Sequence, residues 1–242
     1  MVESSLRIEN VNFRESKSWL FKEDVSFEIK RGEITLLFGP SASGKTTLFK
    51  ILSYLLPPTK GKVLWNGKEI KSIQEANKKR KEVISLIPSQ FLFFQNLNVK
   101  ENLLFSATLS GKKEKEVKKR LEELIETFKF DGDEDIRKIS LSFLLKKNIG
   151  ELSNGQREIV SICRAFLIDA PFILADEMLR SFNEDAEKVV WNTFVNLARK
   201  EKKGILLITH KEHLKDYKEV DRIMRIKNRK VITEKGGKNE VS

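Results

Sequence analysis

Residues 39–46 read GPSASGKT and follow an apolar run at residues 34–38. This spacing fits the pattern G-x-x-x-x-G-K-[ST], in which the glycines let the main chain close around phosphate oxygens and backbone N–H groups point into the loop. Lys45 is predicted to reach the β- and γ-phosphates of a nucleotide, and the Thr46 hydroxyl is predicted to bind Mg²⁺. The Lys-Thr pair disfavours the alternative, an ordinary Gly/Ser turn. The predicted phosphate-binding residues are Gly39, Pro40, Ser41, Ala42, Ser43, Gly44, Lys45, Thr46 and Thr47.

Two carboxylates, Asp176 and Glu177, end a second apolar run at residues 172–175. Acidic residues at the C-terminal end of a strand lie where α/β sheets place their ligands. Without the phosphate-binding loop, two solvated loop acids would be the better interpretation. With the loop present, Asp176 is predicted to hold the Mg²⁺ ion, directly or through water.

Residues 152–156 read LSNGQ and lie between the phosphate-binding loop and the carboxylate pair. Ser153 is a plausible helix N-cap, and Gly155 allows close backbone approach, so a helix N-terminus is predicted here. A serine-capped helix without a ligand is the alternative. In this position, however, the segment resembles the signature motif, usually LSGGQ, of ATP-binding cassette (ABC) ATPases. The resemblance extends over about residues 6–232, with five motifs in the family's order.

The resemblance implies roles that residue types alone do not give. Glu177 would be the general base that polarises the attacking water, and His210 would contact the γ-phosphate and that water. Gln90 resembles the Q-loop glutamine, which would take part in catalysis, bind Mg²⁺ together with Thr46 and Asp176, and report Mg²⁺ and γ-phosphate occupancy to the helical lobe. The aromatic residues that follow it, at 91, 93 and 94, are either ordinary core or part of a groove for a permease helix. Residues expected to bind the ATP held by an opposite subunit are Ser153, Gly155 and Gln156.

Several positions depart from the family's pattern. Asn154 replaces a glycine within the signature, and Asn183 stands where the family usually has the D-loop aspartate. The aromatic residue that stacks on adenine has no clear equivalent. Phe13 is the first choice for it and Trp19 the second, because either ring could stack on a base.

The elements that must position these residues follow from hydrophobic patterning. Strands are predicted at residues 6–13, 25–29, 34–38, 172–175 and 205–209, a hairpin at 62–67 and an edge hairpin around 227–228. Helices are predicted at 46–55, 114–128, 155–167 and 185–199. The first ninety residues are otherwise expected to be strand-rich, with the helix after the phosphate-binding loop as their only helix.

We therefore expect an α/β protein with a P-loop NTPase core. A mostly parallel sheet would be joined by an N-terminal antiparallel β subdomain and an inserted α-helical subdomain. Residues 1–242 would form one ABC nucleotide-binding domain. Its RecA-like core with the β subdomain would comprise residues 1–94 and 155–235, and the helical insertion, about residues 95–154, would end in the signature motif.

Composition narrows the class of protein further. The formal net charge is +11, but lysines alternate with glutamates at 112–120 and 199–203, with no aromatic residues between them to stack on bases. No specific nucleic-acid partner is expected. No apolar run approaches the roughly 18 to 20 residues that span a bilayer, and no signal peptide is recognisable. The single cysteine, Cys163, fits a reducing cytosol and a buried position in a helix.

The resemblance predicts an ATPase subunit of an ABC transporter, with ATP and Mg²⁺ as its ligands. Its partners would be a second copy of itself, or a paralogous cassette, in a head-to-tail dimer, and a transmembrane permease subunit. The permease would hold it peripherally at the cytoplasmic face of the cell membrane. Two alternatives stay open: a non-transport ABC ATPase that acts on nucleic acid or the ribosome, and a degenerate cassette that binds ATP as a switch, which Asn154 and Asn183 would favour.

Overall fold

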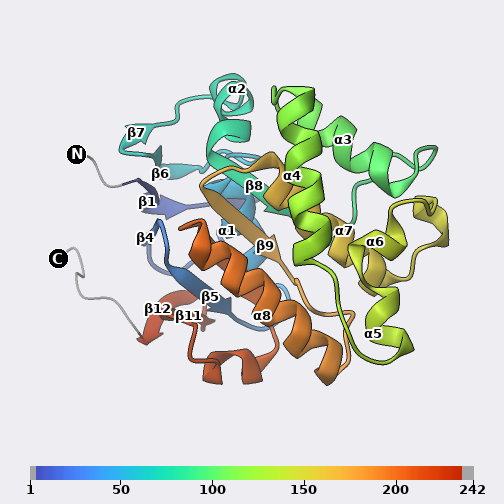
Figure 1. Ribbon diagram of the computed structural model, residues 1–242. Coiled ribbons are helices and arrows are strands. Elements are labelled where there is room, and N and C mark those ends of the chain that lie inside the picture. Colours follow the sequence, from blue (N-terminus) through green and yellow to red (C-terminus); the bar gives the residue numbers. More distant parts are fainter. Residues whose placement is uncertain (1–3, 236–242) are drawn as a thin grey trace.

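The computed structural model describes residues 4–235. A six-stranded sheet runs through its centre in the order β12-β11-β5-β10-β9-β8 (Figure 1). All neighbouring strands are parallel except the pair of β11 and β12. The strands are β5 (Ile34–Phe38), β8 (Ile84–Ile87), β9 (Phe172–Asp176), β10 (Gly204–Thr209), β11 (Arg222–Lys227) and β12 (Lys230–Lys235).

The three middle strands, β5, β10 and β9, are buried at every position. Helices cover one face, and α1 (Lys45–Leu52) with the four-stranded N-terminal sheet described below covers the other. This burial on both faces explains why these strands are continuous apolar runs and not alternating ones. The predicted strands at 34–38, 172–175 and 205–209 and the predicted edge hairpin are confirmed. Because β5, β9 and β10 are parallel neighbours, their carboxyl ends lie at one edge of the sheet.

A four-stranded antiparallel sheet forms the N-terminal part, in the order β4-β1-β6-β7. Its strands are β1 (Ser5–Asn12), β4 (Val25–Lys30), β6 (Lys60–Trp65) and β7 (Lys68–Glu69), and a small separate hairpin joins β2 (Arg14–Glu15) to β3 (Ser18–Trp19). The predicted hairpin at 62–67 is confirmed, since Asn66 and Gly67 turn with φ of 51° and 75°. Helix α1 (Lys45–Leu52) buries Leu48 and Ile51 in a core shared by the two sheets.

Two predictions for this part need correction. Helix α1 ends at Leu52 and not at residue 55, because Tyr54 takes a left-handed φ of 52° before the prolines are reached. A second helix, α2 (Ile73–Val83), occupies a stretch where no helix was predicted. Only Ala76 of α2 is buried, so the segment lacks an apolar stripe. Its local signal is the Ser72 N-cap, which accepts a hydrogen bond from the Glu75 N–H (3.1 Å).

Between β8 and β9 the chain is helical. The elements are α3 (Val99–Leu109), α4 (Glu114–Thr127), α5 (Glu134–Lys138), α6 (Leu141–Leu144), the 3₁₀ turn η1 (Ile149–Glu151) and α7 (Asn154–Ile168). Figure 1 shows α3, α5 and α6 on the side of the molecule away from β1, β6 and β7. Helix α7 connects this helical region to the six-stranded sheet, because its buried face packs against both α3 and α4 and against strand β8.

The remaining helices follow β9 and β10. They are α8 (Glu184–Lys200) and the 3₁₀ helix η2 (Glu212–Asp216). Cys163 is fully buried within α7, as predicted. Within residues 4–235, none of the helices combines the length and the apolar character needed to cross a membrane.

Candidate nucleotide site

The phosphate-binding loop leaves β5 and turns into α1. Ala42 and Gly44 take left-handed φ angles of 59° and 104°. A Cβ atom at Gly44 would lie 2.9 Å from the Phe21 ring, so only glycine fits there. The loop is closed by Lys45, whose Nζ donates to the carbonyls of Gly39 (2.6 Å) and Pro40 (2.9 Å). The side chain is thus already folded into the loop, and its ammonium lies among the backbone groups that are predicted to face phosphate.

Thr46 and Asp176 meet although 130 residues separate them. The Thr46 hydroxyl donates to Asp176 Oδ2 (3.1 Å), and the other carboxylate oxygen, Oδ1, is buried without a hydrogen-bond partner. Burial raises the pKa of Asp176 above its usual value, and the bond from Thr46 partly offsets the rise. A hydroxyl and an unsatisfied carboxylate oxygen are ligands that Mg²⁺ prefers, so these two residues fit the predicted metal.

Glu177 and His210 form a second pair at the same edge of the sheet. Oε2 of Glu177 lies 2.6 Å from Nδ1 of His210. The neighbouring strands β9 and β10 bring them together, and the Glu177 N–H donates to the carbonyl of Ile208 (2.8 Å). Only about a fifth of the Glu177 side chain is exposed, whereas His210 faces solvent. A carboxylate held by an imidazole in this way can accept a proton from a bound water.

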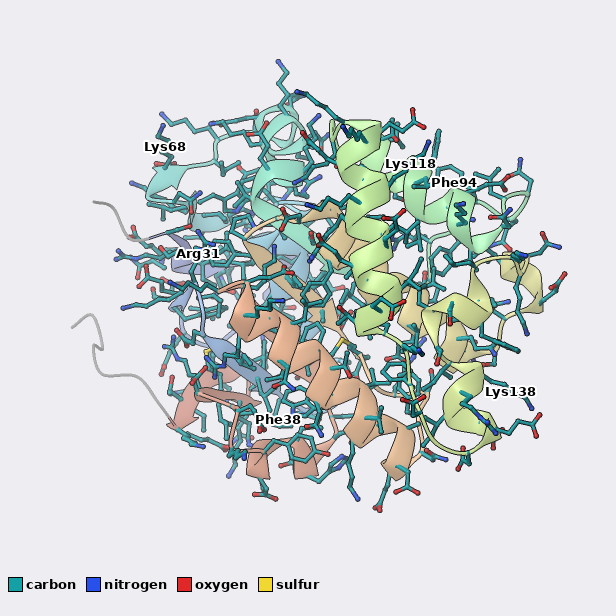
Figure 2. All side chains as sticks on the ribbon, viewed as in Figure 1. Arg31, Phe38, Lys68, Phe94, Lys118 and Lys138 are labelled. Carbon is teal, nitrogen blue, oxygen red and sulfur yellow. The ribbon has the colours of Figure 1, made fainter. Side chains whose placement is uncertain are left out.

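The LSNGQ segment forms the N-terminus of α7 through a capping box. The Ser153 hydroxyl accepts from the Gln156 N–H (3.3 Å), and Gln156 Oε1 accepts from the Ser153 N–H (3.0 Å). Gln156 Nε2 also donates to the carbonyl of Lys138 on α5 (3.1 Å), and the Lys138 side chain itself points outward (Figure 2). Among the described residues no hydrogen bond joins residues 153–156 to residues 39–47. The two predicted phosphate-binding segments therefore make no hydrogen bond to each other within the described part of the chain.

The departures from the family's pattern have visible local consequences. Asn183 is the N-cap of α8, where its side chain accepts from the Ala186 N–H (3.0 Å). Asn154 is the first residue of α7 and is exposed. Both asparagines are thus accommodated at helix starts, where short polar side chains are favoured.

The structure places the other predicted residues outside these two pairs. Gln90 is exposed, while the neighbouring Ser89 lies close enough to Asp176 to lower that carboxyl's pKa. Phe13 is half-buried against the core of the antiparallel sheet, and Trp19 is 40% exposed with the Arg14 guanidinium 5.9 Å from its ring.

The aromatic segment after Gln90 is partly exposed. Phe94 is 45% exposed and makes an edge contact with Phe105. The Phe93 ring lies under Arg164, whose guanidinium carbon is 5.0 Å from the ring centre. The segment is therefore partly exposed to solvent but still packs against α3 and α7.

Sequence reasoning missed three charged residues around the site: Glu158, Arg180 and Lys211. Glu158 and Lys211 bind the turn that follows Glu177, and Arg180 donates to the carbonyl of Ser89 (2.6 Å). Their partners are 21 to 91 residues away in the chain, so no local sequence pattern indicates these contacts. A glutamate among the mostly apolar buried residues of α7 was the available signal for Glu158.

A parallel sheet that ends in a phosphate-binding loop, a hydroxyl–carboxylate pair and a glutamate–histidine pair defines the class of P-loop ATPases. The sequence profile described as ABC transporter matches residues 22–180. The ABC transporter ATP-binding protein YxdL of Bacillus subtilis strain 168 is 31% identical over 210 residues, which cover 85% of this chain and 77% of YxdL. This chain belongs to the ABC transporter family and is one of its ATP-binding ATPase cassettes.

Two further comparisons give another similar relative and a similar fold. The osmoprotectant import ATP-binding protein OsmV of Salmonella typhimurium strain LT2 is 29% identical over 188 residues. That match covers 78% of this chain but only 46% of OsmV, so the chain spans less than half the length of this relative. In three dimensions the chain is similar to the dimeric structure of MJ0796, a bacterial ABC transporter cassette. The TM-score is 0.79 at 24% identity, over 95% of this chain and 98% of MJ0796.

Proposed function

We propose that this chain is the ATP-hydrolysing subunit of a transporter and that two cassettes close around two ATP molecules. The observation that carries the proposal is the placement of the Glu177–His210 pair, at 2.6 Å, beside the Thr46–Asp176 pair at one edge of the sheet. A proton acceptor and a metal-binding pair are thus available next to the phosphate-binding loop. ATP hydrolysis by in-line attack of water requires both.

In this proposal Lys45 exchanges its bonds to the carbonyls of Gly39 and Pro40 for bonds to the β- and γ-phosphates. Thr46 and the free Oδ1 of Asp176 would hold Mg²⁺, which when bound neutralises charge on the phosphates. Glu177 accepts a proton from the attacking water, and His210 keeps the carboxylate in place and contacts the γ-phosphate. Gln90 would sense occupancy of this site, and Phe13 or Trp19 would stack on the adenine.

The second half of the site would come from a partner cassette. Ser153 and Gly155 lie at the N-terminus of a fifteen-residue helix, where free N–H groups and the helix dipole favour an anion. The description of the similar structure MJ0796 as a dimer supports a head-to-tail pair of this chain with a second copy or a paralogous cassette. ATP then binds the closed pair better than the open one, and hydrolysis releases it.

A separate membrane permease would convert this closure into transport. The names of the relatives YxdL and OsmV support a transport role, and the partly exposed aromatic segment around Phe94 supports docking of permease helices near α3. The cassette would thereby sit in the cytoplasm at the inner face of the cell membrane.

Mg²⁺-dependent phosphate release by the purified chain would exclude the alternative of an ATP-binding switch.

The experiment that tests the proposal is Glu177→Gln. The variant should lose turnover by about 100-fold or more, because a general base typically contributes 10²- to 10⁴-fold. It should still bind ATP and accumulate as a dimer in size-exclusion chromatography with light scattering. Glu116→Gln, at an exposed position of α4, is the matched control and should behave as wild type. A Glu177→Gln variant that stays monomeric in saturating ATP and Mg²⁺ would show that the clamp is wrong.

A further inference from the structure

The turn that follows Glu177 has an unfavourable backbone conformation. Glu177 and Leu179 take left-handed φ angles of 57° and 74°, although neither is glycine. A bulky residue such as leucine rarely adopts this region, so surrounding groups must hold it there. Because the turn starts at Glu177, whatever holds residues 178–181 also sets the direction of the Glu177 carboxylate.

One group that holds the turn is Glu158, on the buried face of α7. Its side chain is 1% exposed, and its two oxygens take separate partners. The Leu179 N–H donates to Oε1, and the Ser181 N–H donates to Oε2 (3.3 Å). Burial raises the pKa of Glu158, and the two N–H donors counteract the rise. A carboxylate is suited to this place because both of its oxygens only accept.

The other group that holds the turn is Lys211, the residue after His210. Its Nζ donates to the Leu179 carbonyl (2.6 Å) and to the carboxylate of Glu187, which is 3% exposed. Leu179 is therefore bound through its N–H by Glu158 and through its carbonyl by Lys211. The chain segments that carry Glu177 and His210 are thus connected through one residue, and Glu158 is the member of this connection that lies on α7.

Phe182, the residue directly after this turn, also contacts α7, at the LSNGQ segment. A Cβ atom at Gly155 would lie 3.1 Å from the Phe182 ring, so this glycine and the phenylalanine are in close contact. Gly155 and Glu158 are three residues apart and share a face of the helix. The N-terminus of α7 and the turn after Glu177 therefore form one packed unit within a chain.

We propose that Glu158 is a positioning residue for ATP hydrolysis, which holds the turn after Glu177 and ties it to the N-terminus of α7. The inference rests on the proposed function, in which that N-terminus binds the ATP of the partner cassette. Binding of one ATP by Ser153 and Gly155 is then transmitted, through Glu158, to the general base that acts on the other ATP. Glu158 itself contacts neither nucleotide.

The test is Glu158→Gln, which keeps the side-chain volume. Glutamine offers only one acceptor oxygen, and its NH₂ group must face the second backbone N–H. One of the two hydrogen bonds to the turn is therefore replaced by a repulsive donor–donor contact. We expect kcat to fall by about tenfold or more, as slight misplacement of a catalytic group can cost 10²-fold. The KM for ATP should change less than twofold, since residues 39–47 are untouched. Ser161→Ala is the matched control, because Ser161 is a buried polar residue of α7 whose hydroxyl lacks a hydrogen-bond partner.

Three results would overturn the inference. The first is a folded Glu158→Gln variant with kcat within twofold of wild type, and the second is an equal loss in Ser161→Ala, which would indicate packing alone. The third needs no variant: if the Leu179 and Ser181 amides of the wild-type protein exchange hydrogen as fast as an exposed loop, Glu158 does not hold the turn. A wild-type chain without ATPase activity would instead refute the proposed function.

Discussion

Ser153 combines two roles that substitutions can separate. It caps α7 through the capping box with Gln156, and it is the proposed donor to the phosphate of the partner's ATP. Ser153→Ala removes the hydroxyl, so both roles are lost together. Ser153→Asp keeps an acceptor for the Gln156 N–H but places a negative charge where phosphate would bind. The two variants should therefore agree in their loss of turnover and differ in stability.

The structure sets the size of these effects. Loss of an N-cap costs about 1 kcal/mol, which for a chain of this length lowers the melting temperature by about 2 to 4 °C. Aspartate caps as well as serine and interacts favourably with the helix dipole by about 0.3 to 1 kcal/mol, so Ser153→Asp should melt at or above the wild-type temperature. A lost hydrogen bond to a charged phosphate is worth about 1.5 to 3 kcal/mol, or roughly 10- to 100-fold in ATPase rate.

The assays are thermal unfolding and steady-state phosphate release at 25 °C. Ser72→Ala is the matched control, since the Ser72 side chain likewise accepts from the N–H three residues on and caps α2, a helix that lacks an LSNGQ segment. It should lower the melting temperature and leave turnover unchanged. Wild-type turnover in Ser153→Asp would refute a phosphate-binding role for this helix N-terminus. An unchanged melting temperature in Ser153→Ala would refute the capping argument.

Three further predictions concern single side chains. Asp176→Asn should raise the melting temperature at pH 7 while it abolishes turnover. The folded-state pKa of Asp176 is raised, so the ionised carboxylate destabilises the folded protein. This destabilisation is absent below the unfolded-state pKa of about 4, grows as pH rises from there through the folded-state pKa, and is complete above it. A difference in melting temperature that does not shrink toward pH 4 would contradict this. Lys45→Ala should weaken ATP binding in equilibrium titrations, and an unchanged affinity would count against the phosphate-binding loop. Cys163 is fully buried and its pKa is raised by that burial, so it should react with thiol reagents only in denaturant; labelling of the native protein would disprove the packing of α7.

The elements that were predictable share a local cause. Strands β5, β9 and β10 could be recognised because burial on both faces selects an unbroken apolar run. The cap at Ser153 could be recognised because its partner is only three residues away. Helix α2 was missed because it buries one alanine, so its sequence carries almost no periodic signal.

The phosphate-binding loop, the carboxylate pair, the helix that starts at LSNGQ and, through their order, the family could all be recognised from the amino-acid sequence. Which of these groups meet depends on the packing of the folded chain. Thr46 reaches Asp176, and Glu177 reaches His210, because β5, β10 and β9 are neighbours in one parallel sheet. The grip of Glu158 on the turn after Glu177 likewise depends on how α7 packs. Local patterns reflect only neighbours along the chain, whereas these contacts join residues 21 to 130 positions apart and exist only once the sheet and its helices have assembled.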